Sequence, residues 1–229
     1  MYLNADYLLC MIPAILLTGL ASLYVKSSYR TWGRFAARSG VNGYEAAQRL
    51  IARGGLHGIQ IQGISGTLTD HYDPRTKTLR LSQGVAESPS VASLAVAAHE
   101  LGHAQQDAQG YLPLRFRGAL VPLVNIGSSL GWILIAAGLM LNLLDLAWIG
   151  VAFFAGGAVF ALATLPVEFN ASARARRMLA ETGIVTGPEE QRGVNTVLRA
   201  AALTYVAALV TAIMQLFYFI GMVGGRRRR

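Results

Sequence analysis

The sequence has few charged side chains and only one cysteine. Charged residues make up 14% of the chain, whereas soluble domains usually carry about 25%. Hydrophobic residues make up 53% of the 229 residues, and so much apolar material must be covered by lipid or by a partner. The single cysteine, Cys10, cannot form a disulfide within the chain. The composition therefore excludes an ordinary soluble domain and a disulfide scaffold.

The basic charge balance comes without a nucleic-acid motif. The chain has 20 Lys and Arg residues against 12 Asp and Glu residues, a net charge of +8. It contains neither a zinc-finger spacing nor an RNA-binding signature, so we expect no nucleic-acid partner. In such an apolar chain, basic residues favour contacts with anionic lipid and control of membrane topology.

Four long apolar stretches account for the composition. Each approaches or exceeds the roughly 20 residues that a helix needs to cross a bilayer. Only Asp145 separates the second stretch from the third, which predicts a helical hairpin. No basic residue precedes the first stretch, which favours a retained anchor over a cleaved signal peptide. The stretches run from about Tyr7 to Val25, Ala119 to Leu144, Leu146 to Val167 and Ala200 to Gly224.

Two polar blocks lie between these stretches. In the larger block, Asn42 can cap a helix that runs through Arg53. Another helix is expected to start at Ser90 or Ser93 and to end at about Ala108. Short alternating or β-rich segments predict strands at 57–64, 68–72 and 76–82. The expected organisation is an anchor at 1–25, a large polar unit at 26–118, a transmembrane hairpin at 119–167, a polar helical segment at 168–199, and a last span with a basic tail at 200–229.

The segment His99-Glu100-Leu101-Gly102-His103 carries the chemistry of the larger block. On a helix, a spacing of four residues places both imidazoles on one face, where they can bind one zinc ion. Glu100 lies beside that face and can act as a general base toward water. Two of the four histidines of the chain fall in this segment, which argues against a chance match on a surface helix. A small residue at Gly102 would let another segment or the substrate approach closely.

A catalytic zinc ion usually has three protein ligands, so a further side chain is needed. Glu168 is the candidate that its position favours, because it lies where the third apolar stretch ends and a polar helix is expected to begin. The same carboxylate could instead be only a partner for the dipole of that helix. The residues alone leave both interpretations open.

Three segments together carry a family resemblance: Thr69–Arg75, Ala97–Ala104 and Pro166–Ser172. They resemble the bacterial YugP-like neutral zinc metallopeptidases, small membrane proteins related to the gluzincin clan. The resemblance covers nearly the whole chain. It implies Zn2+ bound by His99, His103 and Glu168, with Glu100 as the catalytic base. The expected fold is a mostly α membrane protein with about four transmembrane helices and a small α+β, zincin-like catalytic unit.

The sequence departs from the broader membrane gluzincins at one position. They often carry an Asp four residues after the ligand Glu, where it supports a zinc histidine. Here that position is Ser172, which can still form a hydrogen bond, and Asn170 can share the task. His71 could contact the substrate or the transition state, but we favour a role in ordering the tight turn that follows it.

Lysine and arginine near the ends of the spans set the expected orientation. If the loop after the first stretch is cytoplasmic, eleven of them, from Lys26 to Arg199, lie inside, and the four of Arg226–Arg229 lie outside. The opposite orientation inverts these numbers. The sequence therefore predicts a protein of the bacterial inner membrane with its catalytic unit on the cytoplasmic side, and only the terminal arginine run conflicts.

Taken together, these features predict a membrane-embedded, zinc-dependent endopeptidase that cleaves peptide bonds at or near the membrane surface. The strand at 76–82, or its neighbour, could hold an extended substrate by edge pairing. The expected partners are the lipid bilayer and a protein or peptide substrate; a homo-oligomer or a regulatory membrane partner stays open. The alternative is a zinc-binding membrane scaffold or pseudo-protease, although an intact Glu100 argues against a purely structural site. A transporter or channel is not expected, because the spans are nearly free of ionisable residues.

Overall fold

The computed structural model describes residues 5–226. They form two compact units, which we call the membrane unit and the site unit. The membrane unit consists of the described residues up to Ser22, of Arg115–Pro166, and of the described residues from Leu203 onward. The site unit consists of Leu23–Leu114 and Val167–Ala202.

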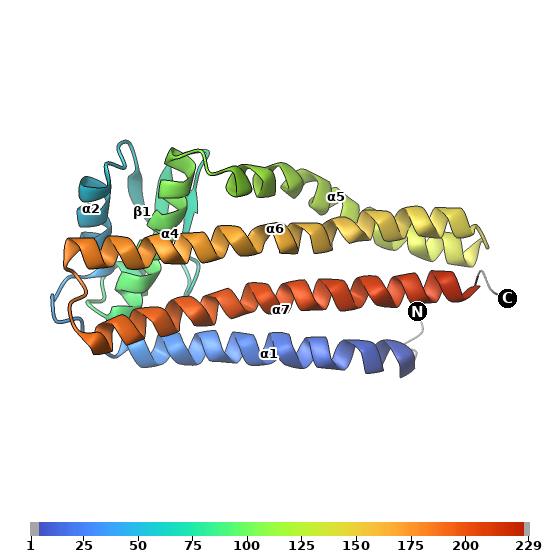
Figure 1. Ribbon diagram of the computed structural model, residues 1–229, viewed down its shortest axis with the longest axis horizontal. Coiled ribbons are helices and arrows are strands. Elements are labelled where there is room, and N and C mark those ends of the chain that lie inside the picture. Colours follow the sequence, from blue (N-terminus) through green and yellow to red (C-terminus); the bar gives the residue numbers. More distant parts are fainter. Residues whose placement is uncertain (1–4, 227–229) are drawn as a thin grey trace. The chain divides into compact units, whose positions relative to one another are not determined.

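Four helices of the described chain are long and apolar enough to cross a membrane (Figure 1). They are α1 (Ala5–Gly33), α5 (Leu112–Met140), α6 (Leu144–Thr182) and α7 (Pro188–Arg226). The prediction of a mostly α membrane protein with four spanning helices is thereby confirmed. The terminal run Arg226–Arg229 conflicts with the expected orientation. Its residues 227–229 lie outside the described part of the chain.

The helices α6 and α7 are longer than a bilayer requires. Each has 39 residues, which corresponds to about 59 Å at the usual rise per residue, against about 30 Å for the hydrocarbon core. We expected the third apolar stretch to end at Val167 and a polar helix to begin at Glu168, but α6 continues through Pro166 to Thr182. A proline inside an apolar helix removes one backbone hydrogen bond without ending the helix. Glu168 therefore lies on the same continuous helix as the third apolar stretch.

The connection between α5 and α6 differs from the expected one. The chain turns at Leu141–Leu143, where Asn142 adopts a φ of 59°, a conformation that Asn tolerates better than most residues. Asp145 is not the separator of the two helices; it lies in the first turn of α6, a position at which the helix dipole favours a carboxylate. Glycines allow the two helices to approach closely: a Cβ at Gly138 would come within 2.5 Å of the backbone nitrogen of Ala147.

In the site unit, α2 (Gly43–Gly54) begins and ends as the sequence predicts. The side chain of Asn42 accepts a hydrogen bond from the backbone N–H of Glu45, and the Glu45 carboxylate accepts one from the backbone N–H of Asn42. This reciprocal pair satisfies two N–H groups at the helix start. Gly55 ends the helix with a φ of 62°, which glycine adopts without steric cost.

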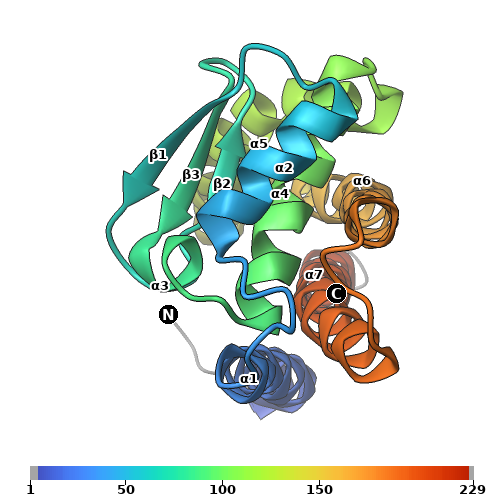
Figure 2. The ribbon, with the colours of Figure 1, turned by 90° about the vertical axis from the view of Figure 1, so that its left-hand side faces the viewer.

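A three-stranded sheet lies beside the helices of the site unit (Figure 2). Its strands are β1 (Gln60–Ile64), β2 (His71–Asp73) and β3 (Thr78–Ser82), in the order β1-β3-β2. The central strand β3 pairs in parallel with β1 and antiparallel with β2, and its Leu79 and Leu81 are fully buried. All three predicted strands are present, each starting a few residues later than expected. A short helix, α3 (Gln83–Ala86), follows β3.

The helix α4 (Val91–Ala108) forms the centre of the site unit. Ser90 is its N-cap, because the Ser90 hydroxyl accepts a hydrogen bond from the backbone N–H of Ser93. Leu94 and Leu101 are completely buried in the hydrophobic core that α4 shares with α2, β3 and the polar ends of α6 and α7. Because α4 is packed on several sides, the few polar side chains that it carries are held in defined positions.

Candidate metal centre

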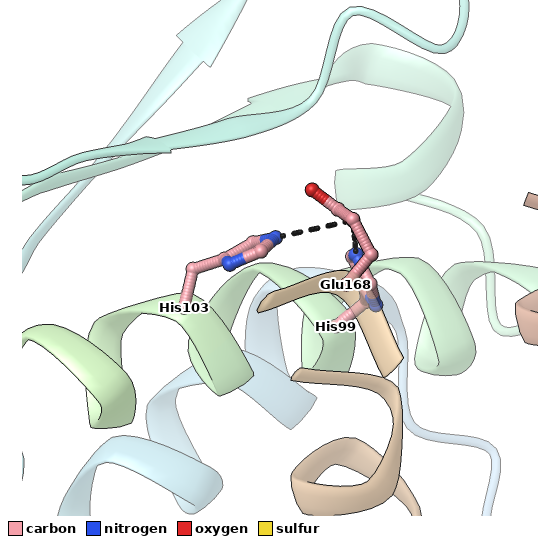
Figure 3. Close-up of side chains that lie close together, drawn as sticks. All are labelled: His99, His103 and Glu168. Carbon is pink, nitrogen blue, oxygen red and sulfur yellow. Dashed lines mark hydrogen bonds and ion pairs between the residues drawn. The ribbon is translucent and has the colours of Figure 1, made fainter. Parts of the chain in front are cut away.

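Three side chains with metal-binding atoms converge in the site unit. His99 and His103 project from the same face of α4, and Glu168 reaches them from α6 (Figure 3). One ligand atom from each side chain lies within 4.8 Å of the others. The structure thus brings Glu168 together with two histidines that lie more than 60 residues before it in the sequence.

The Glu168 carboxylate is the most deeply buried member of this group. Its residue is 2% exposed, and its Oε2 lies 3.2 Å from Nε2 of His99 and 3.6 Å from Nε2 of His103. A buried carboxylate is costly unless a cation or hydrogen-bond donors compensate it. Burial lowers the pKa of His103, but the neighbouring carboxylates of Glu168 and Glu100 raise it by more. The excess of negative charge in this cluster favours a cation.

The outward nitrogens of both histidines have protein partners. Nδ1 of His99 lies 3.2 Å from the Ser172 hydroxyl, and Nδ1 of His103 lies 3.0 Å from Oε1 of Gln106. Both Nε2 atoms consequently face Glu168. Histidines that bind metal usually bond through one ring nitrogen while the other contacts a protein acceptor. Two imidazole nitrogens and one carboxylate are a ligand set of catalytic zinc, so the residues fit this ion.

A close crossing of α4 and α6 makes the convergence of the three side chains feasible. The two backbones meet at Gly102 and Ala171, where a Cβ on Gly102 would lie 2.5 Å from the carbonyl oxygen of Ala171. Real Cβ atoms do not approach an oxygen so closely. The expectation that a small residue at Gly102 admits another chain segment is confirmed, and that segment is α6.

Glu100 lies next to the three converging side chains but is not one of them. Its Oε2 accepts a hydrogen bond of 3.1 Å from the backbone N–H of Tyr72 in β2. Loss of solvent raises the pKa of the Glu100 carboxyl, against the opposing charges of His99 and His103. The carboxylate is therefore held between α4 and the edge of the sheet.

Comparison with known proteins identifies the chain. Residues 7–224 match the model of a family described as "Putative neutral zinc metallopeptidase". The chain belongs to this metallopeptidase family. It is 40% identical over 209 residues to the "Putative membrane protease YugP" of Bacillus subtilis (strain 168), which covers 91% of this chain and 92% of the relative. No solved structure matches the chain.

Membership in the neutral zinc metallopeptidases confirms the resemblance that the sequence suggested. Peptide hydrolysis is the activity of such a family, and zinc is the metal that its description implies. The similarity to a membrane protease and the four apolar helices together define this metallopeptidase as a membrane protein. The roles of its individual residues are a separate question.

In this metallopeptidase, Tyr72 contacts Glu100 through its backbone N–H, whereas His71 has other partners. Successive side chains of a strand point to opposite faces. The Tyr72 hydroxyl donates a hydrogen bond of 2.9 Å to Asp107 of α4. The His71 ring instead lies 2.9 Å from the Thr69 carbonyl oxygen and 3.4 Å from Nη1 of Arg80. These contacts agree with a role of His71 in ordering the turn, while a substrate contact stays a prediction.

The residues expected to support the histidines differ in what they contact. Ser172 contacts His99 directly, whereas Asn170 reaches His103 only through Gln106. Oδ1 of Asn170 accepts hydrogen bonds from Gln106 and from Nε of Arg174. The sequence indicated neither Gln106 nor Tyr72. The spacing of three residues between His103 and Gln106, which puts both on one helix face, was the available signal.

Arg174 binds to α4 through several contacts. Its Nη1 donates hydrogen bonds to Gln105 and Gln109, and its guanidinium lies 5.8 Å from the ring centre of Tyr111. With Oδ1 of Asn170, the guanidinium has three polar acceptors, and a hydrogen bond of a charged group stabilises by about 1.5–3 kcal/mol.

Proposed function

We propose that this protein is a membrane-embedded endopeptidase that hydrolyses peptide bonds at or near the membrane surface. In this proposal His99, His103 and Glu168 hold Zn2+. The convergence of their ligand atoms within 4.8 Å, from α4 and α6, is the observation that supports it most strongly. The proposed substrates are proteins or peptides, and a homo-oligomer or a regulatory membrane partner stays a prediction.

The proposed mechanism assigns proton transfer to Glu100. When bound, zinc would polarise the peptide carbonyl and lower the pKa of water to about 7. Glu100 takes the proton from the attacking water and returns it to the leaving amine. The hydrogen bond from the Tyr72 N–H orients the carboxylate for this transfer. Ser172 and Gln106 hold the imidazoles with Nε2 directed toward Glu168.

Substitution of Glu100 by Gln tests the mechanism. The amide keeps the size of the side chain but cannot accept a proton, so we expect cleavage to be abolished and zinc to be retained. Terminal proteomics of native membranes with active and Glu100→Gln protein would reveal the cleavage sites. Glu87→Gln, at an exposed carboxylate, is the control. Full cleavage by Glu100→Gln would exclude this mechanism, and zinc binding by wild type without cleavage would indicate a membrane scaffold or pseudo-protease.

An extended substrate would pair with the edge of the sheet. Of the two strands that the sequence offered for this role, the one at 76–82 is excluded, because β3 lies in the middle of the sheet and both its edges are occupied. Its neighbour β2 is an edge strand and contacts Glu100 through Tyr72. We therefore assign substrate pairing to β2, as in other sheets that bind peptides. Unchanged cleavage after replacement of β2 residues by proline would exclude this assignment.

The orientation in the membrane is part of the proposal. We place the catalytic unit, residues 26–118, on the cytoplasmic side, because eleven lysine and arginine residues near the span ends then lie inside. The hairpin at 119–167, the segment at 168–199 and the flanking spans at 1–25 and 200–229 complete the proposed organisation. A topology reporter fused after Arg229 should lie outside, and a reporter inside would contradict this orientation.

A further inference from the structure

A network of hydrogen-bonded polar side chains connects His103 of α4 to α6 and leads from there back to α4. It begins at Gln106, which is completely buried. Nε2 of Gln106 donates hydrogen bonds of 2.8 Å to the Val167 carbonyl oxygen and 3.0 Å to Oδ1 of Asn170. Arg174 donates to the same Asn170 oxygen at 2.6 Å and also to Gln105 and Gln109.

The direction of every hydrogen bond in this network is fixed at its ends. The Arg174 guanidinium can only donate and the Val167 carbonyl can only accept. The Gln106 amide group must therefore turn its NH2 toward α6, and its Oε1 toward His103. Since Oε1 is an acceptor, Nδ1 of His103 must carry the proton of their 3.0 Å hydrogen bond. In the neutral ring, the Nε2 atom then keeps its lone pair on the side of Glu168, 3.6 Å from Oε2.

His99 lacks such a constraint. Its Nδ1 faces the Ser172 hydroxyl at 3.2 Å, and a hydroxyl can rotate to donate or to accept. This partner is compatible with either neutral form of the His99 ring. The two histidines of α4 thus differ: the protein selects one form of His103, whereas His99 can adopt both.

We propose that Gln106 is a positioning residue that holds His103 with the proton on Nδ1 and so prepares Nε2 to bind zinc before the ion arrives. The inference rests on the proposed function in taking zinc as the ion. Asn170 and Arg174 act through Gln106 by preventing rotation of its amide. Loss of an outer hydrogen-bond partner typically weakens metal binding by about 10- to 100-fold, and we expect this range for removal of the Gln106 acceptor.

The test compares Gln106→Met with Gln105→Met in the full-length protein in lipid nanodiscs. Met preserves the length of the side chain but offers no strong acceptor. Gln105 is the matched control, because it bonds to Arg174 without touching His103. Zinc affinity is measured on metal-stripped protein by competition with a chromophoric chelator. We expect about 10- to 100-fold weaker binding for Gln106→Met and wild-type binding for Gln105→Met.

A second measurement reports the proton position directly. The chain has four histidines, so ¹⁵N-histidine labelling gives four pairs of ring signals, and the His103 pair is the one lost in His103→Gln. At about pH 9, well above the usual imidazole pKa of about 6.5, metal-free wild type should show His103 protonated at Nδ1. Gln106→Met should show a mixture of both forms, and Gln106→Glu, which retains the acceptor, should restore Nδ1–H.

Two results would overturn the proposal. One is Nε2–H at His103 in metal-free wild type, which requires no variant to fold. The other is a folded Gln106→Met protein with Nδ1–H at His103 and wild-type zinc affinity, which would make Gln106 purely structural. Failure of the proposed function has a different signature, because wild type would then bind no zinc while the metal-free spectrum still reports the His103 form.

Discussion

The interior of the membrane unit and the interior of the site unit are stabilised by different interactions. In the membrane unit, glycines of α5 and α6 allow backbone contact, and the polar contacts include a 3.2 Å hydrogen bond between Thr18 and Thr211. In the site unit, buried polar side chains such as Gln106 and Glu168 connect α4 with α6. Apolar helices need small residues to pack, whereas a buried polar group needs partners of defined geometry. Substitutions should therefore damage the two units in different ways.

Replacement of Glu168 by Gln should produce the largest change, and only in the site unit. The amide keeps the volume but removes the negative charge beside His99 and His103. Loss of a residue that hydrogen-bonds to a metal ligand typically weakens metal binding by about 10- to 100-fold. Loss of a ligand itself should lower zinc affinity by more than that, and cleavage should disappear. Glu181→Gln, at an exposed position of the same helix, should change neither. Metal analysis after dialysis measures the effect, and normal zinc content in Glu168→Gln would remove Glu168 from the ligand set.

A pair of glycine substitutions sharpens the comparison. In both Gly102→Ala and Gly138→Ala, the new Cβ would lie 2.5 Å from a backbone atom. Alanine gains about 1 kcal/mol of helix propensity, but overpacking costs about 1–3 kcal/mol, so both variants should lose stability. Only Gly102→Ala should also lose zinc affinity, because the helices that carry His103 and Glu168 must separate.

The control for the glycine pair is Gly156→Ala in α6. A Cβ at this position would meet no atom of another segment within 4 Å, so the substitution should stabilise the protein by up to about 1 kcal/mol. Thermal unfolding and zinc titration of all three variants measure the effects. Equal zinc affinity in Gly102→Ala and Gly138→Ala would contradict the importance of the α4–α6 crossing for the site.

Tyr72→Phe should have the smallest effect. It removes the hydrogen bond to Asp107 and should lower the free energy of unfolding by about 1 kcal/mol. Because β2 is then less firmly held against Glu100, kcat should fall a few-fold, with zinc affinity unchanged. Tyr44→Phe, which loses only an exposed contact with Gln48, is the control. A loss of zinc from Tyr72→Phe would mean that Tyr72 supports the ligands and not the base.

Local patterns predicted much of this molecule. Hydropathy located the four spanning helices, and helical spacing placed His99 and His103 on one face of α4. The continuity of α6 was missed because the change from apolar to polar residues after Val167 suggested a boundary, whereas one helix continues through it. The position of Glu168 made it a candidate, and only the family resemblance implied that it shares an ion with the histidines of α4. The local residues could not show which segment crosses α4 at Gly102.

The polar contacts around the site were harder to predict. Gln106, Tyr72 and Arg174 have ordinary surface-like side chains, and their partners are distant in the sequence. A sequence shows which groups can form hydrogen bonds but not which ones meet. Arg174 illustrates this limit, since its partners are two glutamines of α4 and an asparagine of its own helix.

The tight crossing at Gly102 has a consequence for how the five-residue pattern is written. A pattern of the type His-Glu-x-x-His treats its third and fourth positions as free. In this fold neither is: Leu101 is fully buried in the core, and Gly102 has no room for even a methyl group. The fourth position is dictated by a neighbouring helix and not by the reaction. For this architecture the informative signature is His-Glu-Leu-Gly-His, a statement about packing as much as about chemistry.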